Sequence, residues 1–352
     1  MGEAISGQTL SEQELRTRAK EIRIKSHRAT LLHLLPWASQ LSTSHRPSNT
    51  PIISAGIEIE ALLVDHNGNP LPAFAQVQES LNGQAHLVTP ELFKCHAEVS
   101  TQQDDLFSLA TSRTDLSHHL QRLLEPLHTA TTTLGIDMLL IGGHPCFEAE
   151  PMKGMLSPHP RYQALIDILD PRAKPVTLQF VDGSTSKATG FYWEGISASI
   201  QVTLKVEPSL ALYVHDAYTS LCPLLLALSA SSPFIMGKDT PHDSNRYLLL
   251  PGSVHGHEDQ TRPGRWRALR SLTSNVGPSR WADQELYQTL QRQRIPDGIA
   301  QYWAEVAGDG PVLITPDDFA GEAVKFPRAS AWNVFSSTSD LWCGISFSQN
   351  RA

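Results

Sequence analysis

"SAGIEIEALLVD", residues 54–65, alternates apolar and polar residues with the period of a β-strand. Because successive side chains of a strand face opposite ways, Glu58 and Glu60 share one face, about 7 Å apart. The opposite face is apolar and is expected to lie against the core; its members are Ile57, Ile59, Ala61 and Leu63. The stretch therefore predicts a strand that holds two carboxylates side by side.

Two later stretches repeat this pattern. In "KCHAEVS", residues 94–100, His96 and Glu98 fall on one side of a short predicted strand. In "SASIQVTLKV", residues 197–206, Gln201 lies on the polar face of a third. The residues expected to face the core there are Ile200, Val202, Leu204 and Val206. In one shared sheet, the glutamates and Gln201 would converge on a surface of hard oxygen ligands, which suits magnesium or manganese.

A solvated sheet face is the plainer interpretation of alternating polar residues. Apolar Leu62 and Val64 nevertheless extend the face of the glutamates, unlike a wholly wet surface. A half-buried pair of carboxylates repels itself, so a bound cation would keep both ionised.

The remaining pattern mixes helices and strands without βαβ regularity and predicts an α+β fold with helices on the outer face of a sheet. Helices are expected over residues 11–38, over 106–134 with a kink at Pro126 and a cap at Gly135, and onward from Pro208. "IDMLLIGG" predicts a buried strand. We expect an N-terminal helical segment and loop over residues 1–50 and one large domain over 51–352.

Composition favours a small-molecule ligand. The net charge is −8, from 28 basic and 36 acidic residues, and no basic run predicts a nucleic acid or membrane partner. The N-terminus lacks an apolar leader, and no run of 18 apolar residues occurs. The four cysteines form no CxxC pair, which is typical of a reducing, cytoplasmic location. The protein could form a homo-oligomer, and the sequence does not decide this.

Six blocks, in order, resemble the signature blocks of the glutamate-cysteine ligases and related carboxylate-amine ligases. The blocks are "GIEIEALLVD", "HAEVST", "GIDMLLIGGHPCF", "RYQAL", "SASIQVTL" and "LLLALSASSPFIMGKDTPHDSNR". The resemblance covers about residues 54 to 250. It implies a glutamine-synthetase-like fold, in which a curved, mostly antiparallel sheet forms a funnel with helices packed on its outer face, and it makes residues 51–352 a ligase-like catalytic domain.

The same resemblance implies an ATP-dependent activity with Mg²⁺, or Mn²⁺ as the alternative. ATP would phosphorylate a carboxylate, and an amine would attack the acyl phosphate to form an amide. The family product is γ-glutamylcysteine, in glutathione biosynthesis. Divalent cations would neutralise the charges of a triphosphate that meets a carboxylate.

Site residues follow from the matched motif positions. Glu58, Glu60 and Glu98 would be metal ligands, and Gln201 would stand near the metals or the nucleotide phosphates. Arg246 would bind a substrate carboxylate or phosphate through its planar fork. Arg161 would contact substrate, or else be a structural surface arginine.

The late family block, with a Glu-x-Arg-like pair, is not found before the chain stops at Arg351 and Ala352. Either the chain is truncated, or Asp340, Glu322 or Arg351 substitutes, or activity has been lost. Two further interpretations therefore stay open beside the ligase. One is a degenerate homologue that acts as a nucleotide-binding or small-molecule-binding regulatory module, and the other is a metal-dependent hydrolase, although no residue recommends itself as its general base.

Overall fold

The fold is known from a computed structural model, which describes Gln13, residues 54–245 with short gaps, Leu249 and residues 282–309. The gaps fall at 82, 102–106, 109–112, 149–151, 160–161, 164–165, 167–169, 171–174 and 208–209. Apart from Gln13, the predicted N-terminal helix lies outside the described residues. So do several residues singled out in the sequence, namely Arg161, Arg246, Glu322, Asp340 and Arg351.

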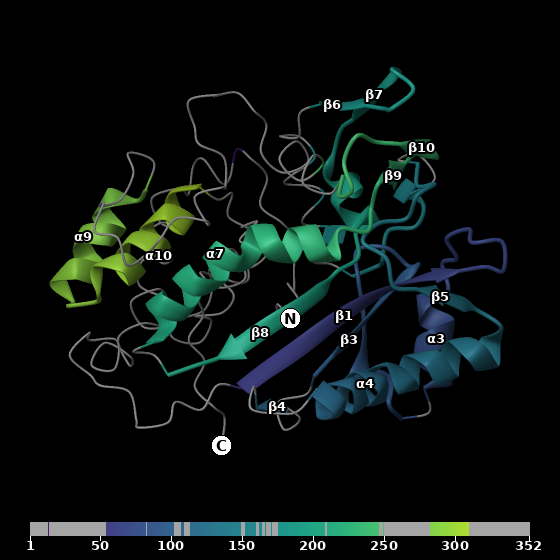
Figure 1. Cartoon of the computed structure of the whole chain (residues 1–352), viewed down its shortest axis with the longest axis horizontal. Helices are drawn as coiled ribbons and strands as arrows, with labels where there is room; N and C mark the ends of the chain where they lie inside the picture. Colours follow the sequence, from purple (N-terminus) through teal and green to yellow (C-terminus); the bar gives the residue numbers. More distant parts are fainter. Residues whose placement is uncertain are drawn as a thin grey trace.

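A six-stranded sheet is organised around one long strand, β1 (Ser54–Val64), which contains the two glutamates. Strands β3, β4, β5 and β8 all pair with β1 in antiparallel fashion (Figure 1). Strand β2 pairs with β3. The bounds of these strands are β2 Val88–Pro90, β3 His96–Ser100, β4 Phe107–Ser108, β5 Asp137–Leu139 and β8 Ile200–Lys205. The predicted α+β class is confirmed for the part of the chain that the structure describes.

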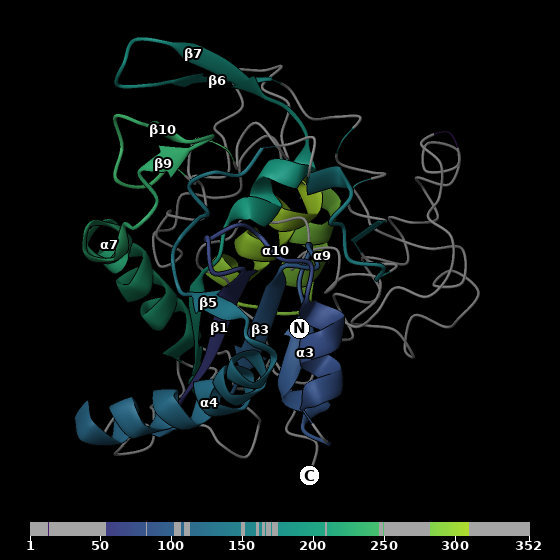
Figure 2. The same cartoon turned by 90° about the vertical axis from the view of Figure 1, so that its right-hand side faces the viewer.

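The apolar face of β1 packs against two helices, α3 (Phe74–Ser80) and α4 (Arg113–Leu134). Figure 2 shows both helices beside the strands. The shared core includes Ile57, Ile59, Ala61 and Leu63 from β1, as the alternation predicts, with Val77, Val99 and Leu127. All seven side chains are at most 5% exposed, so burial on this face fixes the register of β1.

Helix α4 begins later than its apolar period predicts. Phe107–Ser108 forms strand β4 at the end of β1, where Phe107 stands opposite Ala55. A two-residue strand has no period of its own, so the sequence pattern did not separate these residues from the helix predicted over 106–134. At the other end Gly135 takes a positive φ of 65° and donates to the carbonyl of Thr132, which confirms the predicted cap.

Two predictions about strand burial are wrong. Ile200 and Val202 of β8 are 64% and 44% exposed. Helix α4 packs against β3 and β5, whereas β8 pairs with β1 on the side opposite β3. Strand β5 is three residues long and only half-buried, and Leu140 after it is 47% exposed. Strand β5 pairs only with the last three residues of β1, whereas β8 pairs with residues 54–59 of that strand.

A second core lies on the face of the glutamates. Leu62 continues that face into a cluster with Phe93 and Trp193, so the apolar extension predicted beyond the glutamates is buried. Trp193 belongs to the 3₁₀ helix η5 (Phe191–Ile196). Helices α9 (Gln284–Arg292) and α10 (Asp297–Asp309) complete this core with Leu286, Leu290 and Trp303.

The remaining elements lie around these two cores (Figure 1). They are the 3₁₀ helix η2 (Ala85–Leu87), the hairpin β6 (Val176–Gln179) with β7 (Thr185–Ala188), the hairpin β9 (Phe234–Ile235) with β10 (Lys238–Asp239), and helix α7 (Ala211–Ser229). Helix α7 is long and apolar enough to cross a bilayer by length and composition alone. A single such helix is weak evidence for a membrane span, because helices of soluble cores pass the same criterion.

Candidate metal centre

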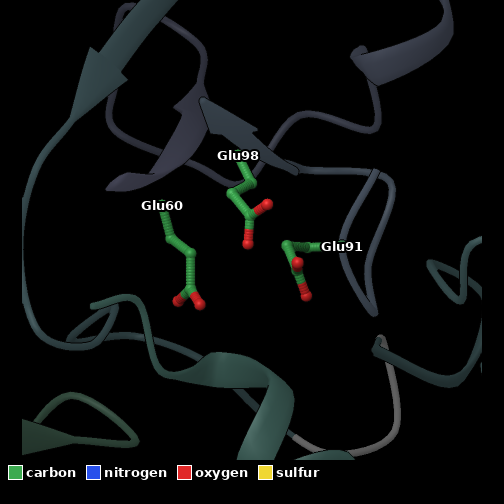
Figure 3. A group of neighbouring side chains, drawn as sticks. All are labelled: Glu60, Glu91 and Glu98. Atoms are coloured by element: carbon green, nitrogen blue, oxygen red, sulfur yellow. The ribbon is translucent and has the colours of Figure 1, made fainter. Parts of the chain in front are cut away.

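Glu60 and Glu98 stand directly opposite each other on neighbouring strands. The register of β1 and β3 pairs these two residues, so both side chains project from the same face of the sheet. Glu98 is 4% exposed, whereas Glu60 is half-buried. Figure 3 shows the two carboxylates side by side and pointing in the same direction. The strand alternation thus places two like charges next to each other in a poorly hydrated position.

A third carboxylate, from Glu91, joins them from the connection between β2 and β3 (Figure 3). Hydrogen bonds from two later side chains hold this connection and the end of β2. The Ser157 hydroxyl donates to the Glu91 carbonyl, and the Tyr162 hydroxyl donates to the carbonyl of Pro90 at 2.7 Å. The sequence interpretation missed Glu91 because it lies in a loop and belongs to no alternating pattern.

The three carboxylates could together hold a divalent cation. One oxygen from each of Glu60, Glu91 and Glu98 lies within 4.8 Å of the other two. Oxygens around one Mg²⁺ lie at most about 4.2 Å apart, since the metal–oxygen distance is about 2.1 Å. Small side-chain rotations would therefore bring one oxygen of each glutamate to binding distance from a single cation. Carboxylate oxygens are also the ligands that Mg²⁺ and Mn²⁺ prefer.

The protonation of Glu98 reflects its surroundings. Burial raises the pKa of its carboxyl above the ordinary value of 4.5, and the charge of nearby Glu58 raises it further. Hydrogen bonds with Thr89 and Glu91 act in the opposite direction and lower this pKa. A divalent cation would supply positive charge that favours the ionised form of this buried carboxylate.

Strand β8 and the residue just before it hold the carboxylate of Glu60. The Ser199 amide donates to Oε2 at 2.8 Å, and the Gln201 side-chain amide donates to Oε1 at 3.1 Å. Gln201 was expected near metals or phosphates; the structure places it against a candidate ligand. Gln201 also stands opposite Glu58 in the register of β1 and β8, so all four residues predicted to converge share this face. Glu58, also a predicted metal ligand, is not one of the three carboxylates that approach within 4.8 Å of one another.

The side chain of His96, two residues before Glu98, forms part of the wall beside the carboxylates. Its ring packs edge-on against Phe93, with 6.0 Å between centroids, and lies 6.3 Å from Phe147. Burial lowers the pKa of this imidazole to about 3, with a smaller effect from the charge of His144. At neutral pH His96 is therefore uncharged, and it adds no positive charge to offset the glutamates.

Comparison with known proteins connects this geometry to a family. The model of glutamate-cysteine ligase family 2 (GCS2) matches residues 54–285, a range that contains all four glutamates of this face. A protein of Rhodococcus jostii (strain RHA1), provisionally named glutamate–cysteine ligase 2-1, is 25% identical over 197 residues, which make up 56% of this chain and 46% of that protein.

Two further relatives show the same similarity. A protein of Nocardia farcinica (strain IFM 10152), provisionally named glutamate–cysteine ligase 2-2, is 26% identical over 280 residues, covering 73% of this chain and 65% of its own length. The human glutamate–cysteine ligase catalytic subunit is 26% identical over 160 residues, covering 38% of this chain and 24% of its own.

This chain spans about half the length of the first curated relatives it matches. The family match nevertheless covers well over half of the chain itself, and it runs through every described strand and through most of the described helices. The matched range contains the strand with its two glutamates and the third glutamate opposite them. This chain belongs to glutamate-cysteine ligase family 2.

Proposed function

We propose that this chain is an ATP-dependent carboxylate-amine ligase whose divalent cation is held by Glu60, Glu91 and Glu98. The observation that carries the proposal is the approach of these three carboxylates to within 4.8 Å of one another on one face of a family-matched sheet. Mutual repulsion opposes such an arrangement unless a cation or a shared proton offsets it.

A divalent cation fits these residues by charge and by chemistry. The donors are all carboxylate oxygens, and one of them is nine-tenths buried or more, so a doubly charged ion would replace the hydration that Glu98 has lost. Mg²⁺ or Mn²⁺ held by these residues would neutralise negative charge on the phosphates of ATP during phosphoryl transfer.

The proposed reaction proceeds in two displacements. A substrate carboxylate attacks the γ-phosphorus of ATP, which releases ADP and forms an acyl phosphate. An amine then attacks the acyl carbon, phosphate leaves, and the amine loses a proton. The residues of this chain contribute by position: Ser199 and Gln201 fix Glu60, and the segment around Ser157 fixes the connection that contains Glu91.

Glutamate and cysteine are the proposed substrates, with γ-glutamylcysteine as the product and glutathione synthesis in the cytoplasm as the setting. The names of the relatives support this choice. Arg246 remains the predicted carboxylate or phosphate contact, and Arg161 remains a predicted substrate contact. A nucleotide-binding module without turnover and a metal-dependent hydrolase remain the alternative functions.

The test is to incubate the full chain with ATP, Mg²⁺, glutamate and a panel of amines, and to follow ADP and amide together. We expect amine-dependent ADP release with cysteine. Glu91→Gln should lose at least about tenfold in turnover, because even the loss of an outer partner of a metal ligand costs about 10–100-fold. Glu125→Gln, an exposed change on α4, serves as the matched control and should leave turnover unchanged.

Other outcomes separate the alternatives. Nucleotide binding without ADP release would identify the binding module, and phosphate release without amide would identify the hydrolase. Full activity of Glu91→Gln would overturn the assignment of Glu91 as a ligand.

A further inference from the structure

Each of the two glutamates on the paired inner strands is held by a donor from the strand on its outer side. Glu60 of β1 is held by Gln201 of β8 and by the amide of Ser199, the residue just before that strand. Glu98 of β3 is held from β2, where the Thr89 hydroxyl donates to its Oε1 at 3.1 Å. The outer strands β8 and β2 thus flank the carboxylates from opposite sides of the sheet.

Thr89 occupies its position because of strand pairing. The register of β2 and β3 sets Thr89 directly opposite Glu98, with Val88 opposite Val99 and Pro90 opposite Ala97. Residues paired in this way have Cβ atoms about 5 Å apart, which is within reach of a hydroxyl and a carboxylate. Pro90 ends the strand, and its carbonyl accepts a hydrogen bond from Tyr162, so β2 is fixed at the residue that follows Thr89.

We propose that Thr89 is a positioning residue of this metal centre: its hydroxyl orients the Glu98 carboxylate toward the cation without binding the cation itself. This inference rests on the proposed function and names a determinant of the same site. A carboxylate can rotate about its terminal bond, and a hydrogen bond to one oxygen fixes that rotation. Without the hydroxyl, the carboxylate would spend part of its time turned away from Glu60 and Glu91.

A purely structural role for Thr89 makes a different prediction. Threonine is also common in strands because its branched side chain packs well on a pleated surface. Thr89→Val keeps that branched shape and removes the hydroxyl, whereas Thr89→Ser keeps the hydroxyl and removes the methyl group. The two variants therefore separate the positioning role from the structural one.

The experiment titrates Mn²⁺ into the full-length protein and follows the free ion by electron paramagnetic resonance. We expect wild type and Thr89→Ser to bind Mn²⁺ with similar affinity, and Thr89→Val to bind it about tenfold more weakly, as is typical when an outer partner of a ligand is lost. Thermal unfolding without metal should be similar for Thr89→Val and wild type. Thr177→Val, in the separate β6–β7 hairpin, is the matched control and should bind Mn²⁺ as wild type does.

Three results would overturn the proposal. Equal Mn²⁺ affinity in Thr89→Val and wild type would show that the hydroxyl is dispensable. An equal loss in Thr89→Val and Thr89→Ser would trace the effect to side-chain packing. If wild type itself bound no Mn²⁺, the metal centre and the proposed function would fail together, a result distinguishable from a failure confined to Thr89.

Discussion

Glu98 is the buried carboxylate of this site. Its carboxyl is 4% exposed, and both burial and the charge of Glu58 raise its pKa above 4.5. Because the raised pKa belongs to the folded state, the metal-free folded protein binds a proton more tightly than the unfolded chain does. This group therefore favours folding below pH 4.5, and that contribution is lost as the pH rises through the raised pKa.

Cation binding should reverse this pH dependence. Divalent cations bind the ionised carboxylate, so they compete with its proton, and their stabilising effect should grow with pH. We expect the rise in melting temperature on adding Mn²⁺ to be larger at about pH 8 than at about pH 5. Thermal denaturation with and without Mn²⁺ checks this, and Glu98→Gln should reduce the increment at every pH. An increment for wild type that stays constant over this range would refute the role of Glu98.

Residue patterns predicted part of the site. An alternation of period two is enough to place Glu58, Glu60, Glu98 and Gln201 on polar faces, because each strand obeys the same geometry. Glu91 could not be found in this way. Its position depends on the hydrogen bonds of Ser157 and Tyr162, which are more than 60 residues away along the chain.

At the scale of elements, close packing between η5 and the β2–β3 connection supports the side of the site that contains Glu91. Gly195 of η5 lies so near this connection that an added Cβ would come within 2.4 Å of Leu92 Cδ2 and Phe93 Cε2. Both side chains are buried in the second core. The absence of a side chain at residue 195 therefore allows η5 to press against the residues that follow Glu91.

Gly195→Ala should damage both stability and the metal centre. Overpacking of this kind costs about 1–3 kcal/mol, and relief of the clash would move Leu92 and Phe93 next to Glu91. We expect a lower denaturation midpoint in urea and weaker Mn²⁺ binding. Gly143→Ala is the control, since a Cβ there would make ordinary contacts of 3.6 Å and 3.7 Å. Unchanged stability of Gly195→Ala would mean that η5 can move away without cost.

Element prediction succeeded where a pattern was long and failed where an element was short. The 22 residues of α4 show a clear helical period, and the helix continues through Pro126. Strands β2 and β4 contain three and two residues, too few for any period, and both are defined by their pairing with longer strands. The donor Thr89 lies on one of these short strands, so no sequence pattern singles it out.

At the scale of the whole molecule, the sheet has a hydrophobic core on each face, yet apolar side chains of β8 are exposed to solvent. Ile200 and Val202 are exposed, although their partners in β1, Ile59 and Ile57, are 2% and 5% exposed. The sequence predicted equal burial for both strands because alternation identifies an apolar face but does not show how far the covering helices extend. Helices α3 and α4 cover β1 and leave β8 uncovered among the described residues.

The pair Ile200 and Ile59 allows this difference to be measured, because the two residues are opposite each other in the register of β8 and β1. Ile59→Thr should destabilise the protein by about 2 kcal/mol or more, since it buries a hydroxyl and removes packed atoms. Ile200→Thr should change stability by no more than about 0.5 kcal/mol, the usual range for surface positions. Urea denaturation of both variants checks the prediction. A loss for Ile200→Thr as large as that for Ile59→Thr would mean that the apolar side of β8 is covered in solution.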